Sequence, residues 1–289
     1  MTDRMGLCRV AAALGFLLAI LPAAVLAGEA SPERRGSVVG WKELRFVAHK
    51  TGISATIDLR LDRESDGLTD GILLESTTHL PGRTFVAHER VDAVTARARQ
   101  IVDTETGVKH HRKTYTLGLR GFRLEFLEPA SLSEMMQPPE RWTKRTDSVS
   151  LFPQALPPGS TVTGPAGLLY AISAANLAAP GDSMTIHVLV QTHVERVTVR
   201  VEGTEPADVT FEQSQGGEAR PVREQVTALR LVARSQPVES DTASAFRIFG
   251  LEGDVEILWD PAQRLPLEIS GHVKVIGQVT VRLASVTLP

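Results

Sequence analysis

Histidine residues are the first candidates for chemistry in this sequence, because three ligands brought together could hold a metal ion. His110 and His111 are adjacent in a predicted strand, where consecutive side chains point to opposite faces, so the two cannot easily share one ion. His79 and His88 could approach each other across a hairpin, but two imidazoles without a third ligand make a weak site. We therefore expect no metal centre.

Two carboxylates, Asp254 and Glu256, have a spacing that resembles an acid–base pair, since residues i and i+2 of a strand share a face about 7 Å apart. The apolar residues Val255, Ile257 and Trp259 occupy the opposite face, which is typical of an amphipathic strand with one solvated side.

The sequence also lacks a glycine-rich phosphate loop and the G-x-S-x-G, H-E-x-x-H and C-x-x-C motifs. We therefore expect no catalytic residues, no cofactor and no enzymatic activity. A hydrolase with a dispersed triad is the weakest alternative, because a triad is defined by geometry and not by sequence.

A basic stretch between Arg90 and Arg123 is the remaining candidate site. It holds eight basic and three acidic residues, in a chain whose formal net charge is −3. Such an uneven distribution attracts anionic lipid headgroups or another acidic partner. The alternative is a solvated hairpin whose long cations keep a sheet edge from pairing, since no hydrophobic anchor is visible beside them. The candidate contact residues are Arg97, Arg99, Lys109, Arg112 and Lys113.

The N-terminus predicts export. A basic first segment precedes the apolar stretch Val10–Leu21, and small residues follow up to Ala27. This order is typical of a signal peptide over residues 1–27, cleaved after Ala27, which predicts a periplasmic protein with no integral membrane segment. The alternative is a retained anchor, because residues 10–27 contain no charge over 18 positions.

Alternating patterns after residue 40 predict antiparallel strands. In Ile53–Leu61, apolar residues alternate with polar or charged ones, so one face of the strand is buried. About a dozen such segments favour an all-β fold, either an antiparallel β-sandwich or an open barrel. The helical spacing of apolar residues predicts one short helix, at Ala166–Ala175. The other predicted strands are Trp41–Ala48, Ile72–Leu80, Thr84–Val91, Thr95–Val102, Val108–Leu119, Phe122–Phe126, Met184–Val190, His193–Glu202, Val226–Ala233, Gly253–Asp260, Leu265–Ser270 and Val273–Val286, with a hairpin loop at Thr104–Gly107.

A proline-rich segment, Pro138–Gly159, interrupts these patterns, because proline cannot occupy central strands. We interpret it as a crossover between two parts of the chain. Residues 28–40 are polar and predicted to be a flexible lead-in. The sequence then predicts a single domain over residues 41–289, with the alternative that its halves, 41–137 and 160–289, fold separately.

The composition, with 42% hydrophobic and 22% charged residues, is that of a folded globular protein. The slightly negative net charge argues against a nucleic-acid coat, so we expect no nucleic-acid partner. The single cysteine excludes a disulfide framework and a zinc ribbon.

Three segments of the second half occur in a characteristic order: Gly164–Ala179 (GPAGLLYAISAANLAA), Pro180–Glu202, and Gly253–Leu283 with its Trp-Asp strand and Arg-Leu-Pro turn. In this order, residues 164–289 resemble the bacterial family of exported proteins numbered 3108 among domains of unknown function. The first half, which carries Pro-Pro-Glu-Arg-Trp-Thr at Pro138–Thr143, is less similar to that family. The resemblance implies an all-β exported protein, and it implies no catalytic residues.

These features together favour a non-catalytic protein of the cell envelope that binds an apolar or amphipathic ligand, such as a lipid. A site for such a ligand should be concave, mostly apolar and provided with a few polar groups. The alternative is a periplasmic scaffold or assembly factor that contacts other envelope proteins through an exposed sheet edge or the proline-rich segment.

Overall fold

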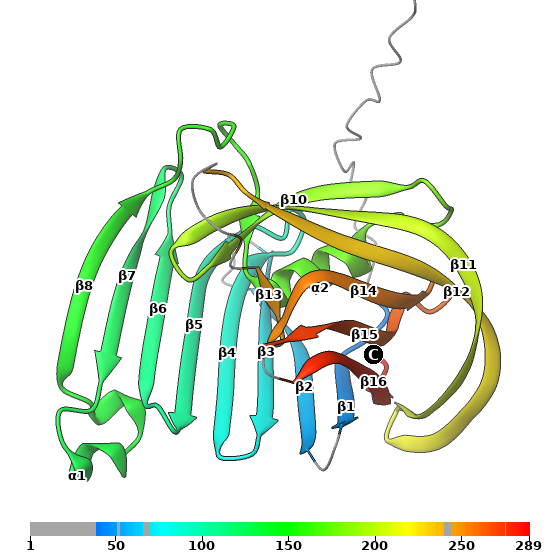
Figure 1. Ribbon diagram of the computed structural model, residues 1–289, viewed down its shortest axis with the longest axis horizontal. Coiled ribbons are helices and arrows are strands. Elements are labelled where there is room, and N and C mark those ends of the chain that lie inside the picture. Colours follow the sequence, from blue (N-terminus) through cyan, green and yellow to red (C-terminus); the bar gives the residue numbers. More distant parts are fainter. Residues whose placement is uncertain (1–38, 51–52, 66–69, 240–243, 245, 275) are drawn as a thin grey trace, which may run out of the picture. The chain divides into compact units, whose positions relative to one another are not determined.

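Strands form most of the described chain and join in one large, mostly antiparallel sheet, which confirms the all-β prediction (Figure 1). The structure is a computed structural model that describes residues 39–50, 53–65, 70–239, 244, 246–274 and 276–289. The predicted signal peptide and all but the last two residues of the predicted lead-in lie outside these ranges.

The first half of the sheet contains the strands β1 (Glu43–Lys50), β2 (Ile53–Ser65), β3 (Asp70–Leu80), β4 (Arg83–Asp92), β5 (Ala98–Gly107), β6 (His111–Leu117), β7 (Gly121–Glu128) and β8 (Lys144–Leu151). The second half contains β9 (Val162–Thr163), β10 (Ser183–Val190), β11 (His193–Gln215), β12 (Glu218–Pro237), β13 (Arg247–Ile248), β14 (Leu251–Asp260), β15 (Leu265–Val273) and β16 (Gly277–Thr287). The helices are α1 (Leu132–Met135), a short 3₁₀ turn at Pro139–Arg141, and α2 (Pro165–Ala174).

The strands form two layers that share one sheet. Strands β1 to β8 lie side by side in sequence order, and β10 to β16 cross in front of them (Figure 1). The layers are joined where β1 pairs with β16, so residues from both predicted halves belong to the same sheet. Strand β11 also runs parallel to β16 at Glu212–Ser214, which closes β11, β12, β14, β15 and β16 into a ring.

The hairpin of β11 and β12 is much longer than expected. Its strands contain 23 and 20 residues, whereas the sequence analysis predicted only His193–Glu202 and Val226–Ala233. The far part of β11 still alternates, with Ala207, Val209 and Phe211 buried, but the matching part of β12 is almost wholly exposed. A strand that buries neither face has no apolar alternation, so its full length could not be predicted.

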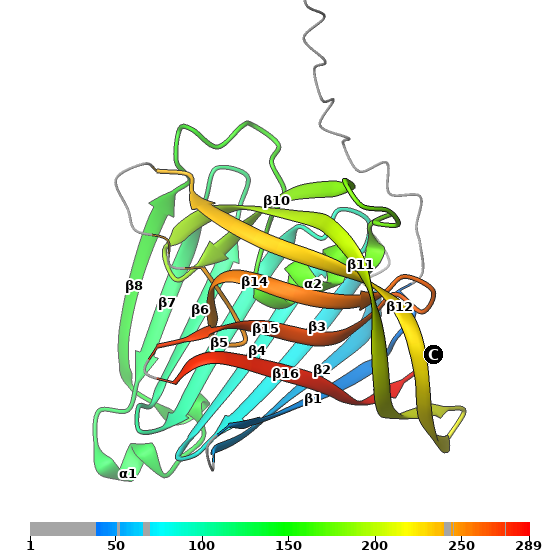
Figure 2. The same cartoon turned by 45° about the vertical axis from the view of Figure 1, so that its right-hand side comes forward.

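Helix α2 lies between the two layers in both views (Figure 2). It confirms the predicted helix to within one residue at each end. Residues 166–173 are all buried, which explains why the helix is apolar around its whole circumference. The indole Nε1 of Trp41 donates a hydrogen bond to Ser173 Oγ (3.1 Å), which ties the end of the helix to the chain just before β1.

The predicted hairpin loop was wrong, and the predicted crossover contains a strand that the sequence did not indicate. The predicted crossover at Pro138–Gly159 contains an eight-residue strand, β8, whose side chains are nearly all exposed, so it shows no buried face in its sequence. The predicted hairpin loop at Thr104–Gly107 is the last part of β5, and the turn follows it at residues 108–110. The polar side chains of Thr104, Glu105 and Thr106 are typical of a loop, but in β5 they are buried or partly buried.

Candidate functional site

The five candidate cations do not form one surface. Arg97 and Arg99 lie where β4 turns into β5, and Lys109 lies in the turn at the other end of β5. Because β5 has ten residues, these two groups are about 30 Å apart. Arg112 and Lys113 are neighbours on β6 and therefore point to opposite faces of the sheet.

The two cations of β6 already have partners. The Arg112 guanidinium forms an ion pair with Glu140 (2.8 Å), which fixes the segment that follows α1. The Lys113 ammonium lies 5.9 Å from the centre of the Phe126 ring, within the range of a cation–π contact. Both residues therefore make contacts within the protein, and neither of these contacts involves Arg97 or Arg99.

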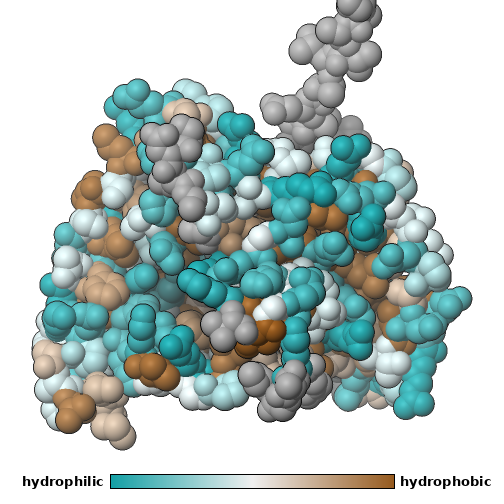
Figure 3. Space-filling model, in the orientation of Figure 1, coloured by the Kyte–Doolittle hydropathy of each residue, from teal (hydrophilic) through white to brown (hydrophobic). Residues whose placement is uncertain are grey.

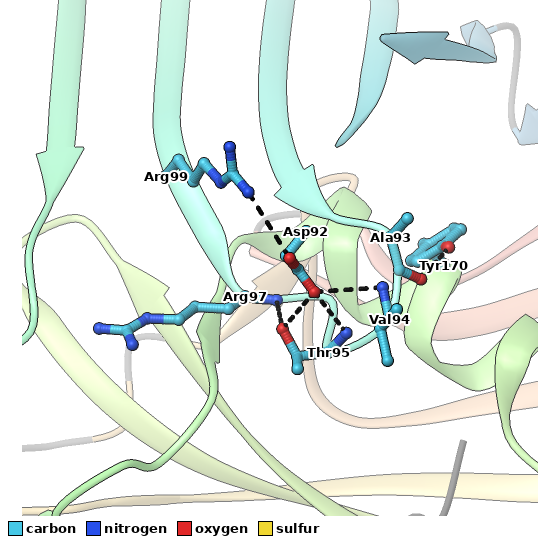
Figure 4. A network of polar contacts seen from close by, with 7 residues as sticks. All are labelled: Asp92, Ala93, Val94, Thr95, Arg97, Arg99 and Tyr170. Carbon is cyan, nitrogen blue, oxygen red and sulfur yellow. Dashed lines mark hydrogen bonds and ion pairs between the residues drawn. The ribbon is translucent and has the colours of Figure 1, made fainter. Parts of the chain in front are cut away.

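The turn between β4 and β5 is held by Asp92 (Figure 4). One oxygen of its carboxylate accepts hydrogen bonds from the backbone N–H groups of Val94 (3.1 Å) and Thr95 (2.8 Å) and from the Thr95 hydroxyl (2.8 Å). The other oxygen lies 3.6 Å from the Arg99 guanidinium. Burial alone would raise the pKa of Asp92, but the Thr95 and Val94 hydrogen bonds and the charge of Arg99 outweigh it and hold the pKa below its ordinary value.

We expect Asp92→Ala to lower the free energy of unfolding by about 1–2 kcal/mol at neutral pH, because the turn loses several hydrogen bonds to a charged acceptor. A depressed carboxyl pKa stabilises the protein above the ordinary aspartate pKa, and this contribution is lost as the pH falls through the pKa of the folded state. Urea unfolding at neutral and acidic pH measures both effects. Asp147→Ala, at an exposed ion pair on β8, is the matched control, and an equal loss in both variants would contradict the role of Asp92.

Helix α2 is anchored to β4 at two points. The Tyr170 hydroxyl donates to the carbonyl of Ala93 (2.7 Å), directly beside the Asp92 turn (Figure 4). At the start of the helix, the two carboxylate oxygens of Glu89 accept hydrogen bonds from the backbone N–H groups of Ala166 (2.8 Å) and Gly167 (2.9 Å). Glu89 therefore caps the helix from a different part of the chain, which the sequence analysis did not predict.

Two glycines make room for the Glu89 carboxylate. A Cβ atom at Gly164 would lie 2.5 Å from the carboxylate, and one at Gly167 would overlap Thr163 Oγ1 and lie 3.0 Å from Glu89 Oε2. The close approach therefore requires glycine at both positions.

Glu89, which is buried, and its neighbour Asp103, which is half-buried, both have raised pKa values. Burial raises the pKa of Glu89 to about 7, although the N–H groups of Ala166 and Gly167 lower it in part. Burial likewise raises the pKa of Asp103 to about 6, against the opposing charge of Lys113. Perturbed carboxyl groups often mark active sites. Glu89, however, is 1% exposed and both its oxygens are bonded to α2, so its geometry is that of a structural anchor.

A cavity beside α2 is the best candidate for a binding site. It has a volume of about 330 Å³. Its walls are formed by the buried side chains of Trp41, Leu61, Ile72 and Tyr170. Its volume is at the lower end of the range for small-molecule sites, which are also mostly apolar. The remaining lining residues are Val39, Lys42, Asp62, Arg63 and Pro289.

The charged residues at this cavity leave an excess of positive charge. Asp62 is engaged in an ion pair with Arg60 (2.8 Å). Lys42 and Arg63 are exposed and form no ion pair within the described ranges. The arrangement thus combines an apolar wall with two exposed cations. The sequence did not predict this cavity. Its apolar wall comes from four segments that only the fold brings together, at Trp41, Leu61, Ile72 and Tyr170.

The other candidates from the sequence are in ordinary structural contacts. His79 Nδ1 lies 3.3 Å from the Thr84 hydroxyl, and His88 lies 3.5 Å from Glu75. Asp254 is paired with Arg234 (3.1 Å). Within the described residues, no three His, Cys, Asp or Glu side chains are grouped so that they could hold a metal ion.

No helix within the described ranges combines the length and the apolar character that a membrane span requires. Comparison of the chain with models of protein families, with curated proteins and with solved structures finds no match. The resemblance to the family of exported proteins therefore stays a prediction.

Proposed function

We propose that this protein is a non-catalytic binding protein of the cell envelope, and that it holds an amphipathic, lipid-like ligand in the cavity beside α2. The observation that carries the proposal is the cavity of about 330 Å³, with its buried apolar walls and the two exposed cations Lys42 and Arg63. The apolar part of the ligand lies against Trp41, Leu61 and Ile72. Its anionic headgroup lies at Lys42 and Arg63.

The chemistry of the cavity supports this class of ligand over others. An apolar wall contributes affinity roughly in proportion to the area removed from water, but it does not orient the ligand. Two exposed cations that form no ion pair within the described residues favour a ligand with a negative headgroup and set its direction. The envelope location rests on the predicted signal peptide, residues 1–27.

We expect dodecanoate to bind more tightly than dodecanol, because only the acid offers a charge to Lys42 and Arg63. The double variant Lys42→Gln/Arg63→Gln should weaken dodecanoate binding about tenfold, as expected for loss of a charge-assisted hydrogen bond, and should leave dodecanol binding unchanged. Leu61→Phe, which narrows the cavity, should weaken both. Isothermal titration calorimetry of the purified protein measures these affinities.

Arg223→Gln is the matched control, because Arg223 is exposed on β12, and its affinity for both probes should equal that of the unchanged protein. If neither dodecanoate nor dodecanol binds, the proposal is wrong. An equal loss for both probes in the Lys42→Gln/Arg63→Gln variant would overturn the assignment of the headgroup.

A further inference from the structure

Large hydrophobic side chains are exposed at both ends of strands β3 to β8. In the space-filling view, brown side chains interrupt the teal surface at the upper and lower left, over these strand ends (Figure 3). One group lies near the end that carries α1, and the other lies at the opposite end. The first group is Leu80, Val108, Leu132 and Met136, and the second is Val94, Leu119, Val149 and Leu151.

We call the second end the arginine rim, defined as residues 93–99, 118–123 and 149–151. Its hydrophobic side chains are among the most exposed in the described chain, with Leu119 at 82% and Leu151 at 78%. The rim comprises the β4–β5 turn, the β6–β7 turn and the end of β8, which neighbouring strands place at the same end of the sheet.

Hydrogen bonds and strand pairing join these three parts into one continuous surface. Arg97 Nη2 donates to the carbonyl of Gly118 (2.9 Å), which links the first turn to the second. The N–H of Gly118 donates to the carbonyl of Gly121 (2.8 Å), and Gly121 faces Leu151 across the β7–β8 pair. With strands about 4.8 Å apart, the rim is about 15–20 Å wide.

The rim carries four arginines and no acidic residue of its own. Two of them are offset by neighbouring acids, Arg99 by Asp92 (3.6 Å) and Arg123 by Asp147 (3.0 Å). Arg97 and Arg120 form no ion pair in the described part of the chain, and Arg120 is exposed. The rim therefore has an excess positive charge next to its hydrophobic side chains.

The opposite end has the same kind of exposed hydrophobic residues, and three acidic residues offset part of the positive charge of its cations, which are Lys109, Arg112, Arg141 and Lys144. Glu140 there pairs with Arg112, and Glu128 pairs with Lys144 (2.6 Å). Glu134 is also acidic and half-buried, and it accepts a hydrogen bond from the Thr143 hydroxyl (2.7 Å). The two ends thus differ mainly in their charge, which makes the α1 end an internal control.

We propose that the arginine rim docks onto the surface of an anionic lipid membrane. Exposed hydrophobic residues that enter the headgroup region, together with cations that meet lipid phosphates, are the combination that holds a peripheral protein on such a surface. The segment that leaves the rim, residues 152–160, contains no charged residue and so does not oppose this contact. The proposal does not depend on the ligand cavity, because it concerns a different surface and different residues.

The test is sedimentation with vesicles of phosphatidylcholine, prepared with or without phosphatidylglycerol. The full-length sequence is expressed, and the protein is purified in the form that remains after any cleavage by the cell. We expect binding only to vesicles that contain phosphatidylglycerol, and weaker binding at high salt. Arg97→Gln/Arg120→Gln should weaken binding about thirtyfold, since each cation near an anionic surface contributes about 1 kcal/mol. Leu119→Ser/Leu151→Ser should weaken it about tenfold.

Leu132→Ser/Met136→Ser and Arg141→Gln, at the α1 end, are the matched controls and should bind like the unchanged protein. All substituted side chains except Arg97 are exposed, and thermal unfolding verifies that each variant is folded. Absence of binding to anionic vesicles would overturn the proposal, as would an equal loss in the α1-end controls. If rim variants change only the oligomeric state, measured by light scattering, the rim contacts a second copy of the chain and the proposal is wrong.

Discussion

Glu89→Ala is expected to lower the free energy of unfolding by about 4 kcal/mol at neutral pH. The substitution removes both acceptors from the N–H groups of Ala166 and Gly167, which are buried and have no solvent to replace them. Each unsatisfied buried donor costs about 1–3 kcal/mol, and the lost side-chain volume adds to the cost. Urea unfolding followed by circular dichroism measures the change.

Glu75→Ala is the control for this prediction. Glu75 lies on β3, is about one-third exposed and pairs with His88 at 3.5 Å, so its removal should change the unfolding free energy by less than about 0.5 kcal/mol. If the two variants lose the same stability, Glu89 does not anchor α2 in the way described. A loss of less than about 1 kcal/mol in Glu89→Ala would lead to the same conclusion.

The stability of the protein is expected to fall as the pH rises from about 4.5 to above 7. Glu89 has a pKa of about 7 in the folded protein against 4.5 ordinarily, so the folded state binds the proton more tightly than the unfolded state. The stabilisation that comes from protonating Glu89 is complete below pH 4.5 and is lost as the pH rises through 7. The shift of the Glu89 pKa from 4.5 to about 7 corresponds to a change of about 3 kcal/mol in the free energy of unfolding.

Glu89→Gln removes this titration and should leave a flatter stability profile between pH 5 and 8. Asp103, whose pKa is raised to about 6, contributes a separate decrease at slightly lower pH that Asp103→Asn should remove. Chemical unfolding at several pH values distinguishes the two. A Glu89→Gln profile that is as steep as that of the unchanged protein would show that another group titrates.

Much of the fold could be predicted because most strands bury one face. Where that pattern is present, as in Ile53–Leu61, the predicted strand matches the structure closely at its start. Where it is absent, as in β8 and the far half of β12, the sequence contains no signal of a strand. The closure of the ring by β11 and β16 depends on three residue pairs between distant segments and could not be predicted.

The candidate sites were harder to predict than the fold. The basic stretch was visible as a charge excess, but strand alternation separates Arg112 from Lys113, and the length of β5 separates Lys109 from Arg97. The hydrophobic residues of the arginine rim are single turn and edge positions, so no period links Leu119 to Leu151. The cavity and the Glu89 cap each combine segments far apart in the chain, which only the register of the sheet determines.

The position of β16 bears on how the chain reaches its folded state. This strand pairs with β1, β15 and β11. Strand β1 therefore gains the second of its two neighbours only when residues 277–287 have been synthesised. Pairings of such long sequence separation form slowly, because the intervening chain must first be ordered or closed into a loop. Strands β2 to β8 pair only with neighbours in sequence and can form early. Strand β16 is therefore expected to pair last, and a chain that lacks it would leave strand edges of both layers unpaired and prone to aggregation.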